Sequence, residues 1–555
     1  MGLFNPLVVL LLIHSLNFAT AFNSAQCCNL AQSRNLFVND PPAADISCGN
    51  VFINDSIPAA ASLHVSYQFC KAECPGYDKS EWSSPGEWAA PIVQFLLPSI
   101  IFSMSIPRHV QFLSTDVLEE AWIKDATGPI ARMAISLALL LPAMLCAALD
   151  TVIWVVLIMS MAGPMMVAGL HEATLDCKIL RALIARDSKL FQGAGDEQLT
   201  TAVELLVTVV SGNLRLGDHD NPDPSSAIIE ALTGKKVRIE GTVATPANGT
   251  PKPRAPPPPL RFSPSHIVHI PSRLTRLVTS QLPFGAIVGA PVVFYLGAFI
   301  YTVLDLLDNP SDQDRAISIA YGRVFPPVYA GAFGTVSMWR RGVNKRAWLE
   351  RTRAWREVDG FRLQVAMGAW DWALVGVFTF VLISLPAAAG AFVSWRTPPV
   401  GFSCRSLSFV LYMGWEIVLT PVYFVWLEAR EERGVVAWCW EVWLFLAFLV
   451  VFTMAVFTSI VLTLMQIIGV YRNCFCYVTT DYWFRLNEAT VDVATDTLGQ
   501  RNSSGGWIAV GNTATVFMAV CALLAWWFQR YIRGLYDLAI KRTVAGLVVQ
   551  TPRSP

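Results

Sequence analysis

Long runs of uncharged apolar residues recur along the 555-residue chain and constrain its fold more than any other feature. A helix needs about 20 such residues to cross the roughly 30 Å hydrocarbon core of a bilayer. Charged residues make up only 15% of the chain, which excludes an ordinary soluble enzyme. Basic and acidic residues number 41 each, so the chain has no basic field that would bind nucleic acid. The sequence therefore predicts an all-α polytopic transmembrane protein whose surroundings are the lipid bilayer.

The apolar runs predict eight or nine spans. Met133 to Leu170 is long enough for two helices that turn at Asp150, whereas Val442 to Val470 fits one tilted or kinked helix. Ala316 to Met338 decides the count, because it contains Arg323 and two adjacent prolines. Nine spans put most Lys and Arg residues on the cytoplasmic side, as the positive-inside rule requires. The single spans are Ala89–Pro107, Pro283–Leu304, Trp372–Val393, Ser406–Leu427 and Trp507–Phe528.

The N-terminus has the pattern of a secretory signal. An apolar run ends in Ala19-Thr20-Ala21, which suits signal peptidase, and the alternative is an uncleaved signal anchor. We therefore expect an integral protein of the endoplasmic reticulum or plasma membrane, with a lumenal or extracellular N-terminus and a cytoplasmic C-terminus. The predicted parts are a signal peptide (1–21), a small cysteine-bearing lumenal domain (22–88), spans one to three (89–170), a cytoplasmic loop with a Pro-rich linker (171–282), spans four and five (283–338), a basic cytoplasmic segment (339–370), spans six to nine (371–528) and a cytoplasmic tail (529–555).

The cysteines agree with this topology. Five lie in the small lumenal domain, and three more fall in outer loops of the nine-span arrangement, which gives an even set of eight. Sequence alone leaves 105 pairings open. The predicted disulfide cysteines are Cys27, Cys28, Cys48, Cys70, Cys74, Cys404, Cys474 and Cys476. Asn54 and Asn502 are the sequons that this topology exposes to glycosylation.

The most basic loop, Arg340 to Gly368, carries Trp348 and Trp355 seven residues apart. That spacing puts both indoles on one helical face, as in a helix that lies on anionic lipid. A solvated basic loop is the alternative.

The chain lacks the short motifs of nucleotide and metal enzymes. It has no G-x-x-x-x-G-K-[ST] phosphate loop and no H-E-x-x-H zinc motif. We therefore predict neither a cofactor nor a metal site.

A carboxyl group within a predicted span is the strongest candidate for chemistry. Glu416 lies at the middle of its span, and Tyr412, Thr420 and Tyr423 share its helical face. Burial in hydrocarbon favours the protonated acid, which can donate a proton to a lipophilic substrate between aromatic rings. An interhelical hydrogen bond without a catalytic role is the alternative. Asp371, at the edge of span six, is the next candidate acid.

Three segments carry a resemblance to a known group: Trp88–Arg108, Gly401–Leu407 and Tyr471–Cys476. With the signal and the cysteine-bearing domain, they resemble fungal polytopic membrane proteins of secondary-metabolite pathways, some of which are membrane-bound terpene cyclases. The resemblance implies a lipophilic, prenylated (meroterpenoid) substrate. Two other functions stay open. A transporter is favoured by the broken span at Arg323, and a cell-surface sensor by the disulfide-rich domain.

Overall fold

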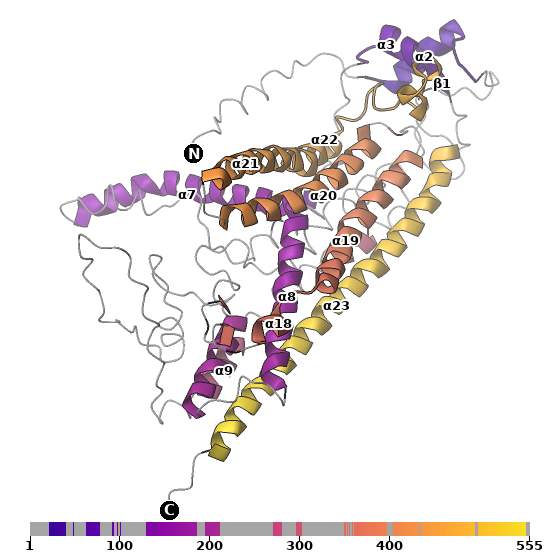
Figure 1. The fold of residues 1–555 in the computed structure, drawn as a ribbon. Coiled ribbons are helices and arrows are strands. Elements are labelled where there is room, and N and C mark those ends of the chain that lie inside the picture. Colours follow the sequence, from indigo (N-terminus) through magenta and orange to yellow (C-terminus); the bar gives the residue numbers. More distant parts are fainter. Residues whose placement is uncertain are drawn as a thin grey trace, which may run out of the picture. The chain divides into compact units, whose positions relative to one another are not determined.

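The described part of the chain is almost entirely helical (Figure 1). The computed structural model describes residues 22–39, 48, 63–77, 129–185, 195–210, 270–279, 296–301, 360–396, 404–431, 435–493 and 498–550, with a few single positions between them. Among these residues, five helical segments are long and apolar enough to cross a membrane. They are Pro142–Ser160, Phe361–Arg396, Cys404–Trp426, Trp440–Ile468 and Ile508–Thr543. The protein is therefore an all-α polytopic membrane protein.

The region predicted to hold spans two and three differs from expectation. Helix α7 (Pro129–Ser160) continues through Asp150, and the break comes at Met161, before α8 (Ala162–Ile184). Pro164 lies three residues after the break, in the first turn of α8, where a proline removes no helical hydrogen bond. A lone aspartate does not interrupt the backbone hydrogen bonds, so the predicted turn at Asp150 was wrong.

The predicted total of eight or nine spans is not reached in the described part of the chain. Three predicted spans lie wholly or mostly outside it: Ala89–Pro107, Pro283–Leu304 and Ala316–Met338. Where two spans were expected between Met133 and Leu170, the structure has one candidate, because α8 carries charged residues through its second half.

The chain divides into two compact units. One contains Met1–Ser99, Phe294–Pro326 and Leu382–Met518, and the other contains Ile100–Val293, Pro327–Val381 and Ala519–Pro555. The division falls within two long helices, α19 (Ala369–Arg396) and α23 (Leu498–Gln550).

The first unit holds a membrane hairpin. Helix α20 (Cys404–Glu431) packs along α21 (Val435–Val456), and the two lie side by side (Figure 1). A π-helical turn, η8 (Phe457–Val461), joins α21 to α22 (Leu462–Ile468). The predicted single helix over Val442–Val470 is confirmed, and its irregularity is this π-helical turn.

The same unit holds the small cysteine-bearing domain. Its elements are α2 (Ser24–Arg34), β1 (His64–Ser66), α3 (Tyr67–Glu73), the 3-10 turns η9 (Thr480–Trp483) and η10 (Leu486–Glu488), and β2 (Thr490–Asp492). Strands β1 and β2 pair antiparallel, with Val65 opposite Val491. Both valines are buried in a core that α2 and α3 also cover. The domain is thus built from two segments about 400 residues apart in the sequence.

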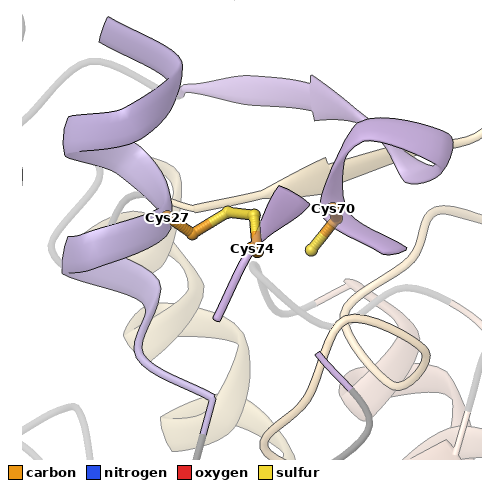
Figure 2. Close-up of side chains that lie close together, drawn as sticks. All are labelled: Cys27, Cys70 and Cys74. Carbon is orange, nitrogen blue, oxygen red and sulfur yellow. A yellow bond between two sulfur atoms is a disulfide. The ribbon is translucent and has the colours of Figure 1, made fainter. Parts of the chain in front are cut away.

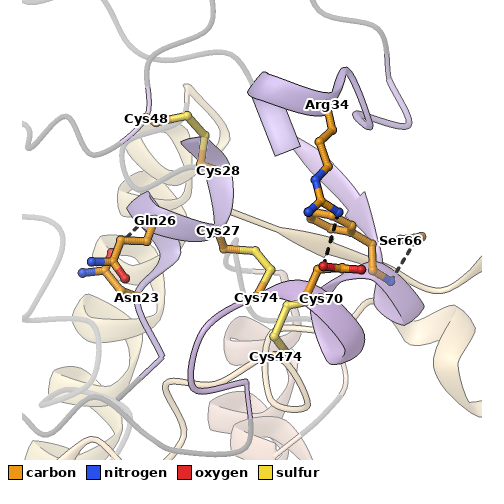
Figure 3. The surroundings of a disulfide bond; sticks show 12 residues. Asn23, Gln26, Cys27, Cys28, Arg34, Cys48, Ser66, Cys70, Cys74 and Cys474 are labelled. Atoms are coloured by element: carbon orange, nitrogen blue, oxygen red, sulfur yellow. Dashed lines mark hydrogen bonds and ion pairs between the residues drawn. A yellow bond between two sulfur atoms is a disulfide. The ribbon is translucent and has the colours of Figure 1, made fainter. Parts of the chain in front are cut away.

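Four disulfides hold this domain together. Figure 3 shows Cys27–Cys74, Cys28–Cys48 and Cys70–Cys474. Cys27 bonds Cys74 and Cys28 bonds Cys48, both within the N-terminal segment. Cys70 bonds Cys474, and Cys404, the first residue of α20, bonds Cys476. These are the eight cysteines that the sequence singled out. Disulfides persist in oxidising compartments, which indicates that this domain lies on the non-cytoplasmic side.

The second unit is organised around an apolar cluster. The second half of α8, α9 (Gly195–Val210), α12 (Ile270–Thr279), α18 (Phe361–Val365) and the last part of α23 contribute buried side chains to it. Trp355 packs against this cluster and meets Phe361 edge to face, with ring centroids 6.5 Å apart. Trp355 therefore contacts protein, where the sequence predicted a lipid-facing position, because α8 and α9 supply an apolar surface that the local pattern does not reveal. Trp348 lies outside the described residues.

Candidate functional site

Glu416 lies on the buried face of α20. Its side chain is 0% exposed, and so is that of Tyr412, one turn earlier. Leu419 and Tyr423 continue the same face and are also buried. Their spacing of three to four residues produces a stripe along one side of the helix. Glu416, Tyr412 and Tyr423 therefore lie together on a buried face of α20, as the sequence predicted. Thr420 donates its hydroxyl to the Glu416 backbone carbonyl at 2.9 Å.

Aromatic rings pack between α20 and α21 on the same face. Tyr423 lies 5.7 Å from Phe448, and Trp426 stacks on Phe448 with centroids 4.9 Å apart and planes 8° from parallel. Phe445 is 5.8 Å from Trp426. These contacts set the register of the hairpin. Extending this antiparallel register toward the start of α20 brings Glu416 level with Ala455, which is fully buried.

The π-helical turn begins two residues after Ala455, at Phe457. Buried hydroxyl and amide side chains gather there and in the next turn, namely Thr458, Ser459, Thr463 and Gln466. Thr458 donates to the Met454 carbonyl at 3.0 Å, and Ser459 donates to the Val456 carbonyl at 3.4 Å. π-Helical turns within α-helices are frequent at functional sites. Sequence reasoning missed this group, although its polar residues are spaced one to four positions apart within an otherwise apolar run.

The start of α20 also carries buried polar side chains. Arg405, Ser406 and Ser408 are all at least nine-tenths buried near the disulfide-bonded end of the helix. In the antiparallel register this end lies level with α22, which carries Thr463 and Gln466. The hairpin therefore carries buried polar side chains from its outer end to Glu416 near its middle.

Asp371 has a different environment. Its carboxylate accepts from Lys178 Nζ at 2.5 Å and from the Gly368 backbone N–H at 2.8 Å, at the first turn of α19. The same Lys178 Nζ donates to the Ala366 carbonyl at 2.7 Å. A carboxylate held by an ammonium group is charged and is a poor proton donor. Asp371 belongs to the second unit and Glu416 to the first, and the local contacts give Asp371 the role of fixing the start of α19 against α8.

Three sulfur atoms of the small domain lie close together. Figure 2 shows the Cys27–Cys74 disulfide with Cys70 beside it, and the three sulfurs lie within 4.8 Å of one another. Thiolates in such a group can bind a soft metal ion. All three sulfurs are engaged in disulfides, so the arrangement is that of two adjacent cross-links in a buried core.

Only one of the two predicted glycosylation sites lies in the described part of the chain. Asn54 lies outside the described residues. Asn502 lies within the first turns of α23, where a helix replaces the loop that a glycan acceptor usually occupies.

Comparisons with known proteins identify no relative. No protein-family model matches the chain, and neither the curated proteins nor the solved structures contain a match. Function therefore has to be argued from the membrane hairpin itself.

Proposed function

We propose that the protein is a membrane-bound enzyme in which Glu416 donates a proton to a lipophilic, prenylated substrate, as a terpene cyclase does. The observation that supports the proposal is a carboxyl group with no exposed surface near the middle of a candidate span. A charged carboxyl at that depth costs about 2.5–3.5 kcal/mol, so such residues are rare and tend to serve function.

In the proposed reaction Glu416 supplies the proton, and aromatic rings farther along the same face stabilise the cation. The Glu416 O–H bond breaks as a C–H bond forms at an alkene carbon of the substrate, leaving a carboxylate and a carbocation. The faces of Tyr423, Trp426 and Phe448 offer negative π-density that stabilises a cation. Loss of a proton from the cyclised product back to the carboxylate regenerates the acid, and no oxidant or cofactor is consumed.

The test is metabolite profiling of a gene-deletion strain complemented with wild type or variants. Glu416→Gln keeps the size and hydrogen bonding of the protonated acid but supplies no proton. We expect a linear prenylated precursor to accumulate and the cyclic product to fall at least 100-fold, since general acid catalysis typically contributes 10²–10⁴-fold. Glu441→Gln, the same change at a partly exposed position of α21, is the matched control and should restore product. Wild-type product levels with Glu416→Gln would refute the proton-donor role.

Transport of a small molecule is a second candidate, favoured by the π-helical turn. Interrupted membrane helices with buried polar side chains form the binding sites of many transporters. The same deletion strain separates the two functions. A transporter predicts normal intracellular products with altered export, and an enzyme predicts a missing product both inside and outside the cell.

A further inference from the structure

The small domain presents a group of large apolar side chains to its surroundings. Phe484 is 84% exposed, and Leu486, Trp483 and Phe475 are 43–50% exposed. Trp483, Phe484 and Leu486 lie in or next to the two 3-10 turns η9 and η10. The Phe475 ring meets Tyr482 of η9, with centroids 5.4 Å apart. We call the residues Phe475 and 482–486 the aromatic platform. Exposed apolar groups of this size on a folded domain usually mark an interaction surface.

The aromatic platform is attached to the outer end of a membrane-crossing helix. Trp395, in the last turn of α19, donates its indole N–H to Thr480 Oγ1 at 2.9 Å. Trp483 donates its indole N–H to the Phe402 carbonyl at 2.6 Å. The Phe402 ring in turn lies 6.4 Å from the Trp395 ring. These contacts hold the platform at the level where α19 leaves the bilayer.

The aromatic surface continues onto the lipid-facing side of α19. Phe392, which is 54% exposed, lies 6.1 Å from Trp395, so an unbroken series of contacts leads from the membrane span to Trp483. The Arg396 guanidinium lies over both rings, 5.6 Å from Phe392 and 5.2 Å from Trp395. Tryptophan with arginine at the end of a span is typical of the membrane–water interface.

The platform is also locally rigid. The Phe484 and Arg485 backbone N–H groups both donate to the Asp481 carbonyl, and Glu488 N–H donates to the Arg485 carbonyl. The Tyr482 ring packs edge to face against Phe475, Trp483 and Tyr67, with centroids 5.2–5.5 Å apart. Because the backbone is already ordered, moving the Phe484 side chain from water into a binding environment costs little further conformational entropy.

We propose that the aromatic platform inserts into the headgroup region of the outer leaflet of the same membrane that α19 crosses. Phe484, Leu486 and Trp483 enter the boundary between headgroups and acyl chains. Arg485, which pairs with Glu488 at 3.2 Å and has a side chain that is 70% exposed, stays at the level of the headgroups. The attachment to the end of α19 and the continuity with Phe392 favour lipid over a separate protein partner. The cross-linked domain therefore rests on the bilayer.

The test uses the full-length protein in a phosphatidylcholine nanodisc, with the photo-crosslinker benzoylphenylalanine at one position. Phe484→benzoylphenylalanine replaces one exposed aromatic ring with another, and Leu486→benzoylphenylalanine is a second probe if the first fails to fold. Ser33→benzoylphenylalanine, at an exposed position of α2 in the same domain, is the matched control. We expect phosphatidylcholine adducts at 484 or 486, by mass spectrometry, at least fivefold above those at 33. Adducts no more abundant than at 33, or adducts with protein only, would overturn the proposal.

Discussion

Two carboxyl groups on neighbouring helices of the sequence, Glu416 and Asp371, have opposite environments. Glu416 is buried on an aromatic face of α20, whereas Asp371 pairs with Lys178 at the start of α19. Both looked like candidate acids in the sequence, because each lies in or beside an apolar run. The difference between them depends on side chains from elsewhere in the chain, above all Lys178, which is 193 residues away from Asp371.

Substitution of Glu416 should separate stability from activity. Because an interhelical hydrogen bond in a membrane averages about 0.6 kcal/mol and the amide can still form one, Glu416→Gln should change the free energy of unfolding by less than about 1 kcal/mol. Thermal unfolding in detergent measures this change, alongside the product assay. A large loss of stability together with normal turnover would mean that the carboxyl is structural.

Substitution of Asp371 should have the reverse effect. Asp371→Asn and Lys178→Met each break a partly exposed ion pair, and a double-mutant cycle should give a coupling free energy of about 1 kcal/mol. The cyclic product should fall less than tenfold in Asp371→Asn, because this residue fixes a helix start and donates no proton. Additive losses of stability would show that the pair does not couple the two helices, and a 100-fold loss of product would make Asp371 a catalytic acid.

At the scale of elements, the π-helical turn is the feature that distinguishes the α21–α22 helix from a plain span. A π-turn holds an extra residue compared with an α-helix, so the polar side chains after it have a rotation that a regular helix would not produce. The predicted kink rested only on the length of the run, and length does not specify where the hydrogen-bond pattern changes.

Deleting Ile460 should convert η8 into regular α-helix. Because the π-turn holds one residue more than the same stretch of α-helix, the deletion removes the irregular turn and leaves the side chains after it close to their present rotation. The variant therefore tests the widened turn itself. We expect loss of function of at least tenfold with helix content retained, measured by product profiling and circular dichroism. Ile460→Ala, which shortens the side chain without changing the register, is the control and should keep most of the activity. Equal activity in both variants would show that the π-turn has no functional part.

The outer disulfides predict which distant segments of the chain are joined on the non-cytoplasmic side, and chemical mapping can check these links. Cys404 and Cys476 join the start of α20 to the segment after α22, and Cys70 joins the N-terminal segment to Cys474. Non-reducing digestion and mass spectrometry should recover both linked peptides. Free thiols at Cys474 and Cys476 would contradict this arrangement. Removing a native disulfide from a small domain typically costs 2–5 kcal/mol, so Cys70→Ser should destabilise the cysteine-bearing domain by that order.

The remaining thiols should behave differently. Cys146, Cys177 and Cys521 are free among the described cysteines, and burial raises the pKa of Cys177, which lies outside the candidate spans. The thiolate is the nucleophile, so Cys177 should react slowly with iodoacetamide at neutral pH and faster as the pH rises. Rapid labelling of folded protein at pH 7 would contradict its burial.

Glycan mapping tests which side of the membrane each loop occupies. The nine-span topology predicts glycans at Asn54 and Asn502 and none at the Asn248 sequon. Endoglycosidase treatment of single Asn→Gln variants should show a mobility shift that Asn54→Gln reduces and Asn248→Gln leaves unchanged. A glycan at Asn248 would invert the topology. Glycosylation at Asn502 is the harder of the two, because this residue lies within α23 and close to the membrane. At a rise of 1.5 Å per residue it is about 9 Å from the start of the candidate span.

Composition and the lengths of the apolar runs were enough to predict a helical membrane protein with a disulfide-bonded outer domain. About 30 Å of hydrocarbon requires long apolar helices, and an oxidising compartment allows cysteines to pair. The sequence also identified the face that carries Glu416, Tyr412 and Tyr423, since helical periodicity is local. Three features could not be predicted from the sequence and follow from the folded chain: the pairing of the cysteines, the ion pair of Lys178 with Asp371, and the packing of Trp355 on a protein core. Those outcomes depend on contacts between residues up to 404 positions apart, and local pattern carries no information about partners at that distance.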